Sequence, residues 1–285
     1  MKTINDEMHK GSITIKNTSE LPLEKLYKLK EEGLSEIIVT NNEEKDAFSV
    51  DVFEKIKIKI AEYIQNIPQV SENDSDKEKK MFTYLYEKIA KNIFYEEGLC
   101  IGYYADLSDR AYASIRCILY GKALCSGYSK ILKNILSEVG IEALYISGGS
   151  ENDKHAWNQV KLDGKWYNCD ITNDADFILK GLKLPHFLKS NEECTRYAKY
   201  PCHDLSKVQE SLESISDKKQ EELIEEQRQR ILKEEEIKEK NETENHSIGK
   251  GFIAKIKDFL KKQKIEPQEL YDLSTVYENK EGRHR

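Results

Sequence analysis

The fold is decided by the stretch Gly121-Lys122-Ala123-Leu124-Cys125-Ser126-Gly127-Tyr128, which runs into a strongly periodic helix. Apolar residues recur on one face of that helix at Tyr128, Ile131, Leu132, Ile135, Leu136 and Val139, and Gly140 is typical of the residue that ends a helix. Cys125 is therefore expected at a helix N-terminus. There the macrodipole and the backbone N–H groups stabilise a thiolate, and the same N–H groups can bind an oxyanion. The sequence predicts that Cys125 is a nucleophile.

A β-hairpin is predicted downstream of this helix. We expect strands over 142–146, 155–162 and 165–171. Asp163-Gly164 is a strong two-residue turn signal, and it sets a register in which Leu162 pairs with Lys165. The same register pairs Ala156 with Ile171, Trp157 with Asp170 and His155 with Thr172.

The hairpin register makes His155 and Asp170 diagonal neighbours on one face of the sheet. Diagonal Cα atoms lie roughly 7–8 Å apart, so we expect the imidazole to hydrogen bond to the carboxylate. A cysteine, a histidine and an aspartate oriented to that histidine form the usual arrangement for activating a thiol. The carboxylate fixes the tautomer of the base, and the base keeps the sulfur ionised.

At these residues the chain resembles the transglutaminase-like superfamily of papain-like cysteine enzymes. The resemblance is carried by 121–128 around the nucleophile, Gly140-Ile141-Glu142-Ala143 before the next strand, His155-Ala156-Trp157-Asn158 around the base and Trp166-Tyr167-Asn168-Cys169-Asp170-Ile171-Thr172 around the acid. The helix over 84–93, followed by Tyr95, is similar to the helix that precedes this core in bacterial members. The resemblance covers 80 to about 204 and says little about 1–70 or 206–285.

The resemblance implies an α+β fold with a transglutaminase-like (papain-like) core, in which the nucleophile helix packs against an antiparallel sheet. It also implies acyl transfer through a thioester, with Cys125 as nucleophile, His155 as general base and then acid, and Asp170 as orienting carboxylate. This mechanism needs no metal and no organic cofactor. The family's usual Thr-Trp after the aspartate is Thr172-Asn173 here, which is a departure from the pattern.

The oxyanion donors are less well defined by the sequence. The backbone N–H of Cys125 is one expected donor, because it lies at a helix N-terminus. Tyr103 or Tyr104, in the loop before the nucleophile, is a candidate for the second donor, and nothing local distinguishes them. Trp157 is expected in the core or in the cleft wall, where it would shield the histidine–aspartate pair from water.

Other parts of the chain differ in composition from this core. We expect a small βαβα unit over 1–70, the catalytic domain over 80–204, an acidic and solvated helix within 206–245, and a basic amphipathic helix and tail over 250–285. The polar run 71–76 marks the first boundary. Three alternatives are open for the helix at 250–264. It docks onto its own domain, which we favour, or it fills a partner's groove, or it lies on an anionic membrane surface.

Composition excludes several classes of protein. The 285 residues include 45 Lys and Arg against 52 Asp and Glu, a net charge of −7 that argues against a non-specific nucleic-acid binder. The six cysteines form no Cys-x-x-Cys pair, which indicates reduced thiols. The sequence has no apolar run of the roughly 18 residues typical of a membrane span and no apolar leader after Met1, so we expect a cytoplasmic protein.

These features predict a cysteine-dependent enzyme that acts on peptide or side-chain amide bonds of a protein or peptide substrate. Acyl transfer to water would make it a peptidase or amidase, and transfer to an amine would make it a cross-linking transglutaminase. Hydrolysis ranks slightly above cross-linking, by analogy alone. The alternative is a catalytically silent transglutaminase-like scaffold that binds partners through its C-terminal helices. Oligomeric state is not predicted.

Overall fold

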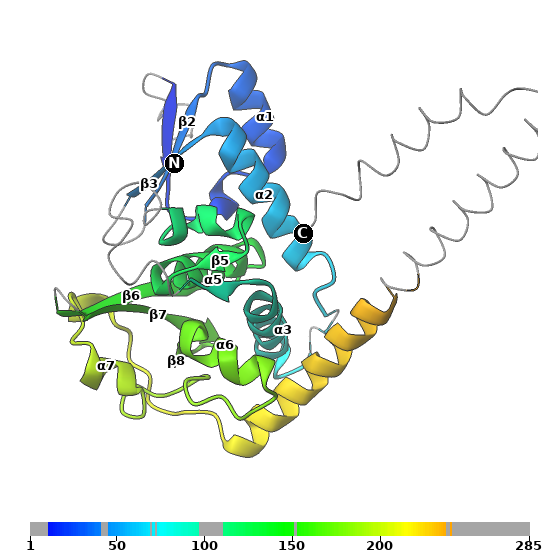
Figure 1. Cartoon of the computed structure of the whole chain (residues 1–285), viewed down its shortest axis with the longest axis vertical. Coiled ribbons are helices and arrows are strands. Elements are labelled where there is room, and N and C mark those ends of the chain that lie inside the picture. Colours follow the sequence, from blue (N-terminus) through cyan, green and yellow to red (C-terminus); the bar gives the residue numbers. More distant parts are fainter. Residues whose placement is uncertain are drawn as a thin grey trace, which may run out of the picture. The chain divides into compact units, whose positions relative to one another are not determined.

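The computed structural model of the chain describes residues 11–40, 45–68, 70–71, 73–96, 111–150, 153–237 and 240 (Figure 1). The predictions made for Tyr103, Tyr104 and the helix at 250–264 lie outside these residues. Residues up to Ile231 form one compact unit. The helices and strands described below belong to this unit as far as Ile231. No helix within the described ranges is long and apolar enough to cross a membrane.

The N-terminal elements form a three-stranded sheet with two helices. They are β1 (Ser12–Ile15), α1 (Leu23–Glu31), β2 (Glu36–Thr40), β3 (Lys45–Ser49) and α2 (Val50–Ile64). β1 pairs in parallel with β2, as the predicted βαβ order requires, and β3 pairs antiparallel with β2. The sequence did not predict β3, because only Phe48 of its five residues is buried and its apolar alternation is weak.

The segment that follows contains both helices and strands. Its elements are α3 (Lys77–Asn92), β4 (Phe94–Tyr95), β5 (Lys122–Ala123), α5 (Cys125–Glu138), β6 (Ala143–Ser150), β7 (Asp153–Leu162), β8 (Lys165–Cys169), α6 (Ile171–Leu179) and α7 (Thr195–Lys199). β6, β7 and β8 form an antiparallel sheet in that order, and β4 pairs in parallel with β5. The fold is therefore α+β, as predicted.

Helix α5 lies at the centre of the fold (Figure 1). Tyr128, Ile131, Leu132, Ile135 and Leu136 of its periodic apolar face are buried, in the same hydrophobic core as residues of α1, α2, α3 and the β6–β7–β8 sheet, and Val139 is partly buried against that core. Asn158 of β7 ties the sheet to this helix, because its amide donates hydrogen bonds to Ser129 O at 3.0 Å and to Leu144 O at 3.1 Å. The core thereby fixes α5 relative to the strands that carry the other site residues.

Gly127 allows the first turn of α5 to approach the preceding segment closely. A Cβ at this position would lie 2.2 Å from Tyr112 O and 2.7 Å from Cys117 Sγ, distances that real Cβ atoms do not adopt. Leu124 N donates to the same Tyr112 carbonyl at 3.0 Å. The glycine two residues after Cys125 is therefore a packing requirement that sets where the helix begins.

The acidic segment differs from the expected solvated helix. Residues 217–237 are helical, and one face of the helix up to residue 231 is buried, at Gln220, Leu223, Ile224, Gln227 and Ile231. Ile224 and Ile231 belong to the main hydrophobic core. The spacing of these five positions places them in one stripe along the helix. The many glutamates and lysines around them make the segment's composition look like that of a solvated helix.

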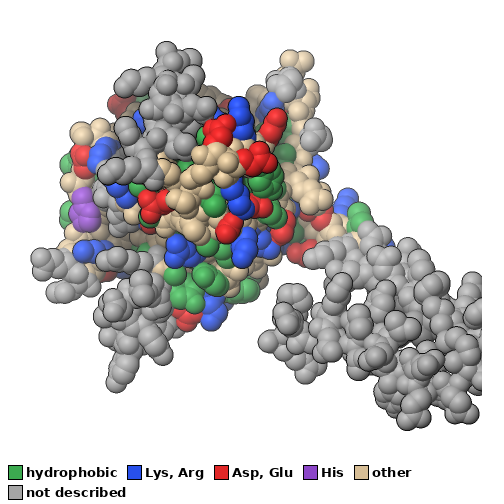
Figure 2. All heavy atoms as spheres, turned by 90° about the horizontal axis from the view of Figure 1, so that it is seen from above, with side chains coloured by type: hydrophobic (Ala, Val, Ile, Leu, Met, Phe, Trp, Pro, Cys, Tyr) green, Lys and Arg blue, Asp and Glu red, His purple; other side chains and the backbone are tan. Residues whose placement is uncertain are grey.

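Charged side chains of both signs are interspersed over the face shown in Figure 2. Several exposed pairs link different elements, such as Lys30 of α1 with Asp51 and Glu54 of α2 at 2.7 and 3.1 Å. Exposed pairs of this kind contribute little to stability, because water and salt screen them.

Candidate active site

Cys125 is the first residue of α5, with Leu124 as the N-cap. The first N–H groups of a helix have no acceptor within the helix, so the half-buried thiol lies beside donors that can bind an anion. Ser126 Oγ and Tyr145 OH of β6 are hydrogen bonded at 2.9 Å, which holds the first turn against the sheet. The predicted place of Cys125 at a helix N-terminus is confirmed.

His155 lies on β7 and is buried, and its Nε2 is 2.7 Å from Asp170 Oδ2. The predicted hydrogen bond between these two side chains is therefore present. Cys125 acts on the same imidazole, because its side chain is among the groups that raise the pKa of His155. The three side chains come from two helix N-termini and one strand.

The hairpin has the predicted register but ends earlier than predicted. Leu162 pairs with Lys165 and Asn158 pairs with Cys169, where β8 ends. The predicted pairs of Ala156, Trp157 and His155 with 170–172 do not form. Instead Asp170 is the N-cap of α6, and its Oδ1 accepts a hydrogen bond from Asn173 N at 3.2 Å. The physical reason is that aspartate is a strong N-cap residue, so the chain turns into a helix directly after the strand.

The electrostatics of the pair follow from burial and from its hydrogen bonds. Burial lowers the pKa of His155, but the hydrogen bonds with Asp170 and Cys125 outweigh it and raise that pKa to about 9. Burial raises the pKa of Asp170, but the hydrogen bond and charge of His155, with the charge of Arg196, outweigh it and lower that pKa. At neutral pH the pair is therefore an imidazolium and a carboxylate. A cationic imidazole beside a thiol favours the thiolate.

Two aromatic rings enclose the imidazole. Trp157 is fully buried, and its ring lies nearly parallel to that of His155 with centroids 6.2 Å apart. It therefore backs the imidazole and does not line an open cleft. Tyr200 lies against His155 with a centroid distance of 4.8 Å. Apolar walls of this kind exclude water from the histidine–aspartate hydrogen bond.

Sequence reasoning missed two polar residues that contact Asp170. Asn173 Nδ2 donates to Asp170 Oδ2 at 2.7 Å, and Arg196 Nη1 is 3.6 Å from the same oxygen. Asn173 had a signal, because it is the third residue after an aspartate, a residue type that favours the N-cap position, and it stands at the departure from the family pattern. Arg196 had none, since nothing in its local sequence links it to Asp170.

The other described cysteines have a different environment. Burial raises the pKa values of Cys117 and Cys169, and it raises that of Cys194 to about 11. Cys202 is half-buried. Among the described residues there is no cluster of three His, Cys, Asp or Glu side chains arranged to hold a metal ion. Cys125, by contrast, lies at a helix N-terminus and acts on the pKa of a histidine that contacts a carboxylate.

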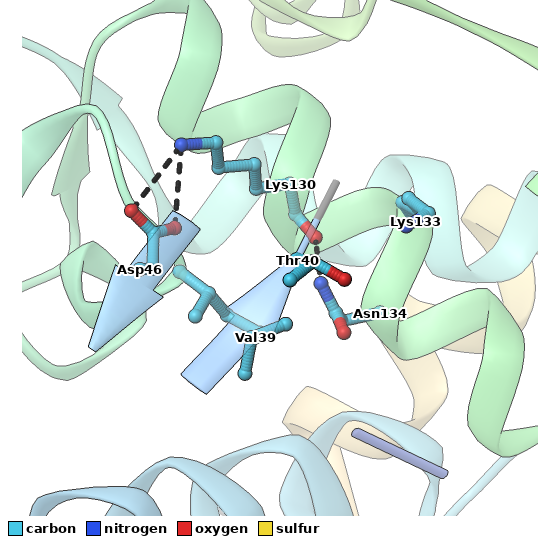
Figure 3. Close-up of a pocket in the computed structure, with 7 residues that line it drawn as sticks. Val39, Thr40, Asp46, Lys130, Lys133 and Asn134 are labelled. Atoms are coloured by element: carbon cyan, nitrogen blue, oxygen red, sulfur yellow. Dashed lines mark hydrogen bonds and ion pairs between the residues drawn. The ribbon is translucent and has the colours of Figure 1, made fainter. Parts of the chain in front are cut away.

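A small pocket lies elsewhere in the fold (Figure 3). Its lining residues are Val39, Thr40, Asp46, Ile115, Lys130, Lys133 and Asn134. Lys130 forms an ion pair with Asp46 at 3.2 Å, and Asn134 donates to Lys130 O at 2.8 Å. None of Cys125, His155 and Asp170 lines this pocket, so it is separate from the candidate site.

A comparison with protein families matched the part of the chain that contains the candidate site. Residues 62–171 match the family model of the transglutaminase-like superfamily. The chain contains a transglutaminase-like domain. The match includes Cys125, His155 and Asp170 and ends one residue after the aspartate. Arg196 and Tyr200 lie beyond it.

Two solved structures are similar to part of the chain. One is a crystal structure of a TGase, with 18% identity over 53% of this chain and 48% of that chain, and a TM-score of 0.35. The other is a candidate cysteine protease from Cytophaga hutchinsonii, with 17% identity over 42% of this chain and 37% of that chain, and a TM-score of 0.30. The chain thus spans less than half the length of either protein. A search of curated proteins found no match.

Proposed function

We propose that this transglutaminase-like domain is a cysteine-dependent acyl-transfer enzyme that acts on peptide or side-chain amide bonds. The observation that carries the proposal is the contact of His155 with buried Asp170 at 2.7 Å, with Cys125 at the N-terminus of α5 among the groups that act on the same imidazole. The family match supports the same class of chemistry.

The proposed reaction has two stages. The Cys125 thiolate attacks the amide carbonyl carbon, and the oxyanion that forms is stabilised by N–H groups of the first turn of α5. His155 donates its proton to the leaving nitrogen, the C–N bond breaks, and ammonia or an amine leaves a thioester on Cys125. Asp170 keeps the imidazole oriented and stabilises its cationic form.

In the second stage a water molecule or an amine attacks the thioester carbonyl. His155, now neutral, takes a proton from the attacking group, the C–S bond breaks, and the Cys125 thiolate is restored. Attack by water gives a carboxylic acid, whereas attack by an amine gives a new amide. We rank hydrolysis before cross-linking, by the analogy given above. Which of the two reactions occurs depends on whether the closed site admits an amine and excludes water.

Alkylation of the cysteines tests the activated thiol without a known substrate. We expect iodoacetamide to modify Cys125 faster than Cys202 at pH 6–7, as read by peptide mass mapping, because the thiolate is the reactive form of cysteine and a neighbouring imidazolium favours it. Cys202 is the matched control, since both thiols are half-buried. His155→Ala should remove the advantage of Cys125.

His203→Ala is the control for replacing a histidine. His203 Nδ1 hydrogen bonds with Ser147 Oγ at 3.0 Å, so this variant should leave the alkylation rate of Cys125 unchanged. Equal rates at Cys125 and Cys202 in the unaltered chain would contradict the proposed enzyme and favour the scaffold reading.

A further inference from the structure

A segment outside the family match returns to the candidate site. Residues 200–203 lie along β6, where Cys202 forms a bridge with Gly148 and Gly149 N donates to Pro201 O at 3.0 Å. A Cβ on Gly148 would lie 2.5 Å from Tyr200 O, so the close approach requires a glycine. This attachment fixes the position of α7, which immediately precedes it.

Arg196 of α7 is held against Asp170 by contacts on both sides. Its Nη1 is 3.6 Å from Asp170 Oδ2, and the exposed fractions of the two side chains are 11% and 1%. Its Nη2 donates to His186 Nε2 at 3.3 Å. Burial, with the charge of Arg196, lowers the pKa of His186 to about 4, so this imidazole is neutral at pH 7 and can accept that hydrogen bond. The guanidinium is therefore a fixed charge in a buried place.

Tyr200 connects Arg196 to the other side of the pair. The guanidinium carbon lies 5.7 Å from the centre of the Tyr200 ring, and the same ring packs on His155 at 4.8 Å. Tyr200 N also donates to Arg196 O at 2.7 Å. Arg196 thus contacts the carboxylate directly and the imidazole through one aromatic ring.

The titratable groups around the pair come from every element that packs on it. They are Cys125 of α5, Tyr86 of α3, Cys169 of β8, Asp174 of α6, and His186, Cys194, Arg196 and Tyr200 from the segment after α6. Burial raises the pKa of Asp174 to about 8, so this carboxyl is mostly protonated at pH 7. Arg196 consequently supplies the permanent positive charge among these described groups.

We propose that Arg196 is a positioning residue of this site, whose buried guanidinium balances the charge of Asp170 and so limits how firmly the carboxylate holds the proton on His155. The inference rests on the proposed function, in which His155 gives that proton to the leaving nitrogen and later takes one from the attacking group. An unbalanced carboxylate would favour the imidazolium too strongly for both transfers.

Titration of His155 by NMR tests this role. The full chain is labelled with ¹⁵N-histidine, and His155 is assigned by the signal that His155→Gln removes. In Arg196→Met we expect the pKa of His155 to rise by about one pH unit, because removal of a cation several ångströms away favours the protonated ring. Arg196→Lys keeps the charge and should leave that pKa close to the value of the unaltered chain.

A purely structural role for Arg196 predicts a different result. The pair would separate in Arg196→Met, water would enter, and the pKa of His155 would fall toward its ordinary 6.5. A fall or no change in the folded protein overturns the proposal. The ring signals of His203, which contacts Ser147, report whether the variant is folded. If Arg196→Met does not fold, Arg196→Gln, which retains an N–H donor for His186, gives the same comparison.

The outcome is distinguishable from failure of the proposed function. Selective alkylation of Cys125 is measured in the unaltered chain, whereas the titration compares variants at Arg196. If Cys125 is not selectively alkylated but the pKa of His155 rises in Arg196→Met, the electrostatic role of Arg196 stands and the proposed enzymatic function is refuted.

Discussion

Buried charged side chains are the most informative single residues in this protein, because burial changes their pKa values and hence their protonation. In the candidate site, Asp170 has a histidine, an asparagine amide and an arginine as neighbours, and these keep its pKa low. Glu87 of α3 is the opposite case. It is fully buried, neither carboxylate oxygen has a hydrogen-bond partner, and burial raises its pKa to about 7.

Glu87 should make the protein less stable as the pH rises. Its pKa is higher in the folded chain than the ordinary 4.5, so its stabilising contribution is complete below pH 4.5 and is lost as the pH rises to about 7. The total loss is about 3 kcal/mol. Glu87→Gln should remove it, so the variant gains stability relative to the unaltered chain between pH 5 and pH 8, measured by urea unfolding.

Glu221→Gln is the matched control for this experiment. Glu221 is exposed on the helix over 217–231, so its replacement should change the free energy of unfolding equally at both pH values. A difference between Glu87→Gln and the unaltered chain that is the same at pH 5 and pH 8 would contradict the prediction.

At the scale of elements, helix α5 determines where the Cys125 thiol lies. Its apolar face and the hydrogen bonds of Asn158 fix it on the sheet, and the close contact at Gly127 fixes its first turn. The same packing explains the glycine at position 127, since a side chain there would collide with the backbone of Tyr112.

Gly127→Ala should displace the first turn of α5. The new Cβ would lie 2.2 Å from a backbone oxygen, so we expect a loss of about 1–3 kcal/mol in the free energy of unfolding and slower alkylation of Cys125. Ser137→Ala, near the other end of the same helix, should change neither quantity appreciably. Normal alkylation of Cys125 in a folded Gly127→Ala chain would refute this account.

At the scale of the whole molecule, the helix over 217–231 completes the hydrophobic core. Leu223, Ile224 and Ile231 are buried, and Gln220 Nε2 donates to Leu184 O at 2.9 Å. Lys219 also forms an ion pair with Asp76 at 2.6 Å, at the start of α3. The acidic segment is therefore structural up to residue 231.

Two truncated chains distinguish the structural part of this segment from the rest. A chain ending at residue 240 keeps all three buried side chains and should retain selective alkylation of Cys125 and cooperative unfolding. A chain ending at residue 205 loses these three buried side chains, worth about 1.5–3 kcal/mol each, together with partly buried Val208 and Ile215, and the sum is comparable to the whole stability of a domain. We expect it not to unfold cooperatively by circular dichroism. Equal unfolding transitions in the two chains would show that the helix is dispensable.

The sequence by itself determined the local parts of the candidate site. The apolar period after Cys125 predicts a helix that begins at the nucleophile, and Asp163-Gly164 fixes the register that brings His155 close to Asp170. Both signals act over a few residues, where backbone geometry leaves few alternatives. They were not sufficient to find the end of β8, because the N-cap preference of Asp170 competes there with the strand pattern.

Tertiary structure alone decided which distant side chains complete the site. Arg196 and Tyr200 reach Asp170 and His155 because 200–203 pack along β6, and no local pattern encodes that contact. The burial of the helix over 217–231 is also a tertiary result, since five buried positions among charged residues gain their energy only against a surface that the rest of the chain supplies. Periodicity specifies an element, whereas its partner depends on complementary packing between segments far apart in the sequence.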